Sequence, residues 1–226
     1  LKAQQYQGQF EIALVEQTLG GVYSYTDNYD QANHYYQQAL KRYQLLQFPA
    51  YIAETRLGIA TTFRHQKKWI EALQAYEEYY QSIAFQGVLG DSFYYHYGKS
   101  ITLALSGKCT EAEAGINAAV AANGPRDYLG ELYKKQAICA LKKGLVPAAR
   151  RALSSARTII DQTPELVDTL WQAELLKIES DIANSAGDQK KALALFQQYH
   201  EVATRLQSKK ASSRLFDLKV ALESER

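Results

Sequence analysis

Residues 100–119 read SITLALSGKCTEAEAGINAA, and their spacing predicts two short helices that turn back on each other. Small and bulky apolar residues recur at the intervals of three, four and seven that mark one face of an α-helix. Ser100 and Leu103 fall on the first helix, and Ala112 and Ile116 fall on the second. A serine opposite an alanine lets two antiparallel backbones approach closely, and the bulkier residues then fill the surrounding space.

The same pattern occurs five times along the chain. An alignment is anchored on Ala32, Ala72, Ala112, Ala149 and Ala192, which are about 40, 40, 37 and 43 residues apart. Twelve residues before each alanine stands a small residue, in Gly20, Ala60, Ser100, Ala137 and Ser180. Four residues after it stands a bulky one, in Tyr36, Tyr76, Ile116, Leu153 and Phe196. Such a repeat predicts stacked helix pairs, because one pair cannot bury its apolar face alone.

This pattern resembles the tetratricopeptide repeat (TPR) family, in the small residue of the first helix and the alanine and aromatic positions of the second. One departure is the family's leucine-glycine pair, which is in phase only at Leu19-Gly20, whereas Leu57-Gly58 lies two residues early. The long period is similar to the roughly 40-residue subclass of the family. The resemblance implies an all-α, right-handed superhelical solenoid of about five helix pairs with a long C-terminal helix.

We therefore expect two regions. The first is a TPR-like array over 1–205, and the second is a capping or connector helix over 206–226. The repeats are expected at about 9–47, 48–88, 89–123, 124–162 and 163–205.

Turn residues predict where the helices end. Gly107, Gly144 and Gly187 fall between the two helices of the last three repeats, where a left-handed residue ends a helix. Thr110–Glu113 has the sequence of a capping box, which would open the second helix of repeat 3. Neither Gly nor Pro occurs from Gln189 onward, so one long helix is expected to the end of the chain.

Composition and motifs argue against several functions. The chain has 26 basic and 24 acidic residues, a balance that does not favour nucleic acid or a membrane surface as a partner. No apolar run approaches the ~20 residues needed to span a bilayer. Phosphate-binding loops, dinucleotide fingerprints and nucleophile elbows are absent, and the four histidines lack metal-type spacing. We predict no enzyme, no cofactor and no metal site.

The two cysteines, Cys109 and Cys139, lie in no metal or redox motif. We interpret both as small core residues of a protein in a reducing compartment. The prediction is a cytoplasmic protein, with a periplasmic origin left open.

The inner face formed by the first helices is where TPR proteins hold ligands, so the resemblance implies a groove there. Aromatic platforms with a few directed polar groups suit a protein or peptide partner. The candidate contacts are Gln17, Ser24, Tyr25, Arg64, His65, Tyr94, Tyr97, Ile101, Lys134, Lys142 and Lys177. For each of them the alternative is packing of helix on helix. The paired cations of repeat 4, including Lys134, are interpreted as a solvated face.

A chaperone partner is not predicted. Chaperone-binding TPR proteins clamp a C-terminal carboxylate with a lysine and an asparagine on the first helix. Gln17 and Gly21 occupy those places here.

The C-terminal sequence gives the most specific hypothesis about function. The stretch 192–200 and the helix to Arg226 are similar to the last repeat and connector helix of bacterial TPR-containing diguanylate cyclases and related regulators. This predicts a sensory or regulatory module of a larger signalling protein, which fits a chain that starts at Leu1 and contains no Met. The alternatives are a stand-alone adaptor or scaffold, and a receptor for a peptide pheromone.

A short heptad seam follows the last repeat. Its apolar residues are Ala211, Leu215, Leu218 and Leu222. The seam predicts a weak homodimer through 206–226. The alternative is a cap that packs on repeat 5.

Overall fold

The computed structural model describes residues 2–85, 92–163 and 169–224, which form helices and turns and contain no strand. Consecutive helices pack in pairs, so the predicted all-α architecture of helix pairs is confirmed. The chain separates into two compact units, unit 1 (residues 1–124) and unit 2 (residues 125–226), which we describe in turn.

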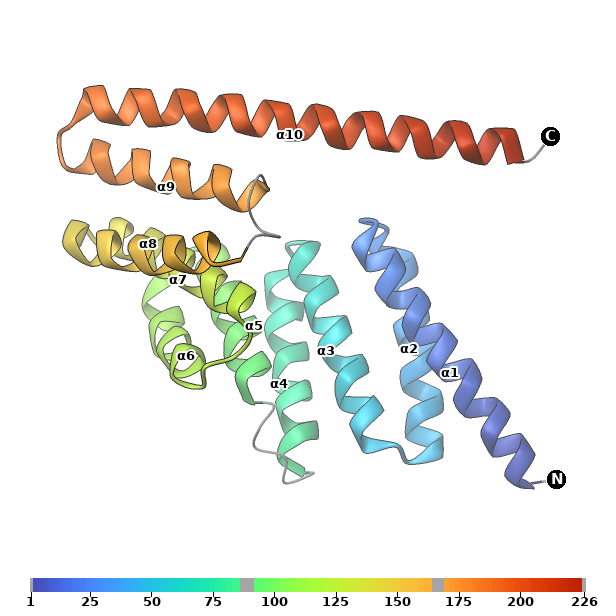
Figure 1. Ribbon diagram of the computed structural model, residues 1–226. Helices are drawn as coiled ribbons and strands as arrows, with labels where there is room; N and C mark the ends of the chain where they lie inside the picture. Colours follow the sequence, from blue (N-terminus) through green and yellow to red (C-terminus); the bar gives the residue numbers. More distant parts are fainter. Residues whose placement is uncertain (1, 86–91, 164–168, 225–226) are drawn as a thin grey trace. The chain divides into compact units, whose positions relative to one another are not determined.

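Unit 1 contains three helix pairs (Figure 1). They are α1 (Lys2–Tyr25) with α2 (Tyr29–Leu46), α3 (Pro49–His65) with α4 (Trp69–Phe85), and α5 (Ser92–Leu105) with α6 (Cys109–Ala121). Besides its partner, α3 contacts both α1 and α5. The first helices of the three pairs therefore lie next to one another, as a common inner face requires.

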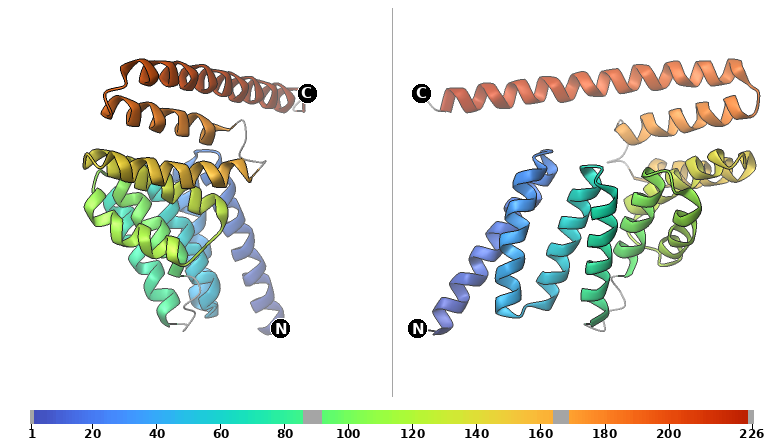
Figure 2. Two further views of the ribbon diagram at one scale, coloured as in Figure 1. Left: turned by 60° about the vertical axis from the view of Figure 1, so that its left-hand side comes forward. Right: turned by 180° about the vertical axis from the view of Figure 1, so that it is seen from behind.

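Unit 2 contains two helix pairs. They are α7 (Arg126–Lys142) with α8 (Val146–Asp161), and α9 (Leu170–Ser185) with α10 (Gln189–Ser224). Both α7 and α8 contact α9. The predicted long C-terminal helix is confirmed, since α10 is a single helix of 36 residues whereas α9 has 16. The second half of α10 extends past the end of α9 (Figure 2).

Burial confirms the predicted register of the repeats. The five alanines are at most 8% exposed, and the small residues twelve positions earlier are buried as well. In the last pair the Ser180 hydroxyl donates a hydrogen bond to the Ala192 carbonyl at 2.7 Å, which joins the two helices at these positions. Phe196 departs from the pattern and is 46% exposed, because no helix pair follows α10 in the described part of the chain.

The turn inside each pair has the same geometry five times. Its left-handed residues are Asp27, Lys67, Gly107, Gly144 and Gly187. The residue after each of them donates its backbone N–H to the carbonyl five positions earlier, as Lys108 does to Leu103 at 2.9 Å. This Schellman motif satisfies the last carbonyls of the first helix. The prediction for the three glycines is confirmed.

The predicted capping box is wrong. The helix α6 begins at Cys109, and the side chain of its N-cap residue, Lys108, makes no capping hydrogen bond. The Schellman turn at Gly107 fixes the start of α6 before Thr110, so Thr110 already lies in the first helical turn.

The interpretation of the cysteines as reduced thiols is also wrong. Cys109 and Cys139 are buried, as predicted, but both are disulfide-bonded and neither is free. Their sequence spacing carries no sign of this, because neither cysteine lies in a motif that marks a disulfide.

The register makes a prediction about Ala112, which is fully buried in α6. Ala112→Leu adds three heavy atoms at a position that has no exposed surface. We expect a loss of roughly 1–3 kcal/mol in the free energy of unfolding from overpacking. Urea unfolding measures it, with the exposed Ala121→Leu in the same helix as control. Equal stability of the two variants would contradict the register.

Candidate functional site

The inner face of unit 1 follows one stripe of α3. Glu54, Leu57, Thr61 and Arg64 are spaced by three, four and three residues, so they lie on one side of the helix. The neighbouring helices α1 and α5 flank this stripe. The result is a surface formed by three first helices, at the place where the sequence predicts a groove.

A pocket of about 560 Å³ opens between α1 and α3. Two of the predicted contacts, Gln17 and Ser24, line it. The hydroxyl of Thr55 donates to Gln17 Oε1 at 3.4 Å, and that of Thr62 donates to Ser24 Oγ at 3.2 Å, so both residues also link α3 to α1. The full lining is Leu14, Gln17, Thr18, Gly21, Ser24, Tyr36, Tyr51, Glu54, Leu57, Gly58 and Thr61.

Tyr36 reaches this pocket from α2, the second helix of its pair. It passes between two glycines, where a Cβ atom on Gly20 or Gly58 would lie 2.8 or 2.7 Å from its ring carbons. Only glycine leaves this space. From the sequence, Tyr36 is predicted only as a bulky packing residue of the repeat, and its place in the pocket was not predicted. The sequence feature that could have indicated this role is Gly58, a second small residue two positions before Ala60.

One acidic side chain, that of Glu54, lines the pocket. Glu54 is exposed at its rim and forms no hydrogen bond or ion pair with the described residues. Burial raises the pKa of the Tyr36 hydroxyl, and the charge of Glu54 raises it further. Burial likewise raises the pKa of Tyr43, in α2, to about 12, with smaller contributions from Tyr51, Glu54 and Glu16.

An aromatic platform follows at the other end of the α3 stripe. The Arg64 guanidinium lies 5.5 Å from the centre of the Tyr97 ring, a cation–π distance. Tyr97 stacks on Phe93 at 6.0 Å, and Tyr94 meets Phe93 edge-on at 5.3 Å. Three of the predicted contacts, Arg64, Tyr94 and Tyr97, are therefore brought together by α3 and α5.

Two other predicted residues of unit 1 lie at helix ends. Tyr25 is 90% exposed at the last position of α1. His65 stacks on Tyr29 at 6.2 Å. Desolvation and the neighbouring Arg64 lower the pKa of His65, while Asp27 opposes them.

Ile101 and Lys134 are corrections to the predicted site. Ile101 is 1% exposed and belongs to the core of unit 1, so it has no surface to offer a ligand. Lys134 is also 1% exposed. Its ammonium group pairs with Glu131 at 2.6 Å and with Glu174, and lies 3.7 Å from the centre of the Trp171 ring. Lys134 thus joins α7 to α9 and is not part of a solvated face.

The remaining predicted cations of unit 2 are exposed. Lys142 lies at the end of α7. Lys177 in α9 pairs with Asp181 at 3.0 Å, one turn further along the same helix. A surface pair of this kind contributes little stability.

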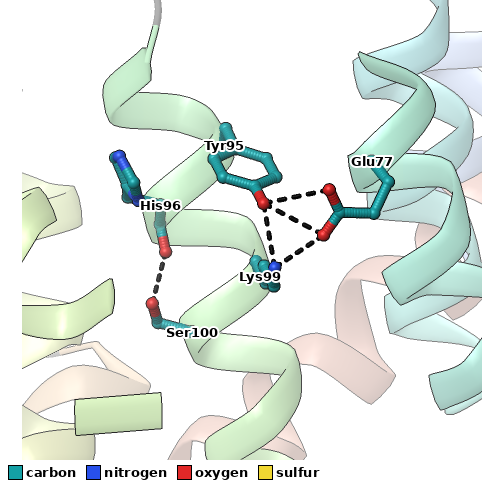
Figure 3. A network of polar contacts seen from close by, with 5 residues as sticks. All are labelled: Glu77, Tyr95, His96, Lys99 and Ser100. Carbon is teal, nitrogen blue, oxygen red and sulfur yellow. Dashed lines mark hydrogen bonds and ion pairs between the residues drawn. The ribbon is translucent and has the colours of Figure 1, made fainter. Parts of the chain in front are cut away.

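A polar network joins α4 to α5 and was not predicted (Figure 3). Lys99 Nζ lies 2.6 Å from Glu77 Oε1 and donates to the Tyr95 hydroxyl at 2.8 Å, and this hydroxyl donates to Glu77 at 2.9 Å. Burial acts to raise the pKa of Glu77, but the hydrogen bonds from Lys99 and Tyr95 outweigh it and lower that pKa. All three groups are paired, so we assign the network to packing.

Neither a metal cluster nor a membrane-spanning helix occurs in the described residues. Residues 2–85, 92–163 and 169–224 contain no group of three or more His, Cys, Asp or Glu side chains placed to hold a metal ion. In the same residues no helix combines the length and apolar character needed to cross a membrane.

The consecutive helix pairs and the turn that they share define a helical-repeat protein. Residues 6–82 match the tetratricopeptide repeat family. The crystal structure of BtubC (BKLC) from P. vanneervenii is similar in fold, with a TM-score of 0.68 and 15% sequence identity over 88% of this chain and 82% of that one. No curated protein sequence matches the chain significantly. Residues 6–82 therefore resemble the tetratricopeptide repeat family, whose repeats are typical of modules for protein–protein interaction.

Proposed function

We propose that the inner face of unit 1 binds an extended segment of a partner protein or peptide. The observation that supports this most is the continuity of one stripe of α3, from the pocket at Glu54 to the platform at Arg64 and Tyr97. Ten helical residues separate Glu54 from Arg64, which is about 15 Å along the axis. An extended segment covers that distance with about five residues.

The test uses random nine-residue peptides displayed on phage and selected on the full chain. Affinities of the selected peptides are then measured by fluorescence anisotropy. We expect Tyr97→Ala to weaken binding by about 1–2 kcal/mol, which is 5- to 30-fold, as truncation of an aromatic anchor does. The control is Tyr6→Ala, because Tyr6 is exposed on α1 outside the pocket. Thermal unfolding shows whether each variant is folded. Unchanged affinity in folded Tyr97→Ala would contradict the proposal.

We further propose that α10 mediates self-association. The support is its length, because about twenty of its residues extend beyond the stretch that pairs with α9. The apolar seam from Ala211 to Leu222 lies in this extension, and its side chains lie outside the described part of the structure. A continuous helix shared by two copies would suit the sensory or regulatory role that we propose for a bacterial signalling protein. A stand-alone adaptor or a pheromone receptor does not require it.

Removal of residues 207–226 tests this second proposal. Light scattering over a range of concentrations should show a weak dimer for the full chain and a monomer for the truncated one. Fewer than two heptads hold two helices only weakly, so the thermal midpoint of unfolding should change little. Lower thermal stability with unchanged mass would instead identify this segment as a cap.

The cysteines bear on the compartment. Disulfides persist in oxidising environments and are rare in the cytosol. Because Cys109 and Cys139 are disulfide-bonded, we propose an oxidising compartment such as the periplasm, in place of the cytoplasm that the sequence analysis favoured.

A further inference from the structure

We propose that the pocket between α1 and α3 recognises a lysine or arginine side chain of the bound segment. This inference rests on the proposed function, since it assumes that a peptide or protein segment lies along the inner face of unit 1. It adds which residue type the segment must place at the pocket.

The charge of the pocket is the first reason. Among the eleven described residues that line it, Glu54 is the one with a formal charge at pH 7. Its carboxylate has no hydrogen bond or ion pair with the described residues. Glu16, on α1, is already paired with Arg42 at 2.9 Å. A cation entering the pocket would therefore meet an unneutralised carboxylate, whereas an acidic side chain would be repelled.

The hydroxyl of Tyr36 is the second reason. Tyr36 lines the pocket although its side chain is 92% buried, and its hydroxyl forms no hydrogen bond with the described residues. The hydroxyl oxygen itself is accessible from the pocket, so a ligand can replace water as its hydrogen-bond partner. An ammonium or guanidinium group has N–H donors that the hydroxyl oxygen can accept.

The walls of the pocket suit the rest of a long cationic side chain. Leu14 and Leu57 provide apolar surface for the methylene stem, which lysine and arginine bury readily. The rings of Tyr36 and Tyr51 provide aromatic surface that attracts a cation. The volume of about 560 Å³ leaves room for such a side chain together with part of the segment's backbone.

The test extends the selection of phage-displayed nine-residue peptides on the full chain. We expect the selected peptides to share a lysine or arginine at one position. In a synthetic copy of a selected peptide, replacement of that residue by methionine should weaken binding about tenfold. Glu54→Gln should cost about as much with the original peptide and little with the methionine peptide, because the two changes remove the same interaction. Tyr36→Phe should weaken the original peptide and leave circular dichroism unchanged.

Glu11→Gln is the matched control, because Glu11 is exposed on α1 outside the pocket. It should leave the affinity unchanged. This inference would be overturned by selected peptides that share no basic residue, or by a Glu54→Gln variant that binds with full affinity. The proposed function would still stand in either case, provided that Tyr97→Ala weakens binding of the selected peptides. If no peptide binds the full chain, even at a protein concentration 100-fold above that used in the selection, the proposed function and this inference both fail.

Discussion

Lys134→Met will lower the free energy of unfolding by about 3 kcal/mol at pH 7, because it removes the cation from a buried ion-pair cluster. Lys134 is 1% exposed and pairs with Glu131 and Glu174. The exposed fraction of the Glu131 side chain is 17%, so its charge is poorly solvated once Lys134 is gone. Lys135 remains at 2.9 Å and compensates in part. Methionine keeps most of the apolar stem, so the loss comes mainly from the charge.

The control is Lys142→Met, which makes the same change at an exposed position of the same helix. It should change stability by less than about 0.5 kcal/mol. Urea unfolding of both variants is the measurement. Equal effects of the two substitutions would show that the Lys134 cluster does not stabilise the fold.

The contribution of Glu131 to the stability of the fold should decrease as the pH falls. Burial acts to raise the pKa of Glu131, but Lys134 and Lys135 outweigh it and hold that pKa below its usual value. A carboxyl with a lowered pKa in the folded state stabilises the protein above its unfolded pKa of about 4.3, and this contribution is lost as the pH falls through the folded pKa. Wild type should therefore lose stability below about pH 4, and the difference from Lys134→Met should shrink there.

The repeat architecture could be predicted from the sequence because it depends on local spacing. Close approach of two helices requires a small residue on each, and residues such as Ser100 and Ala112 report this at a fixed offset. The left-handed glycines could also be predicted, because their role depends on backbone conformation alone. Gln17, Ser24, Arg64 and Tyr97 are expected on the inner face from the resemblance to the tetratricopeptide repeat family, and their role in binding stays a prediction.

The burial of Lys134 and the entry of Tyr36 into the pocket could not be predicted, because both depend on contacts between residues far apart in the sequence. A lysine in a first helix suggests a solvated charge, and the burial of Lys134 depends on Glu174 and Trp171, which follow about 40 residues later. The entry of Tyr36 into the pocket requires glycines on two different helices, and only one of them, Gly20, occupies the small position twelve residues before an anchoring alanine.

The tyrosine–glycine contact recurs one pair further along and gives the second large effect. A Cβ atom on Gly98, in α5, would overlap the ring of Tyr76, in α4, which is 1% exposed. An alanine in place of a helical glycine normally stabilises a helix by up to about 1 kcal/mol. At Gly98 the overlap with a buried ring should outweigh that gain, and we expect Gly98→Ala to lower the free energy of unfolding by about 2 kcal/mol.

Two further variants separate the clash from other causes. Gly8→Ala in α1 makes the same substitution with no atom within 4 Å of the new Cβ, so it should stabilise the protein slightly.

Tyr76→Leu introduces the residue type found at the equivalent position Leu153 and should cost about 2–4 kcal/mol through the cavity that it leaves. Because the leucine makes room for the alanine methyl group, the double variant should be more stable than the sum of the two single effects predicts, by about 1–2 kcal/mol. Strict additivity in urea unfolding would mean that the Gly98 methyl group and the Tyr76 ring do not meet, and the packing of α4 against α5 described above would then be wrong.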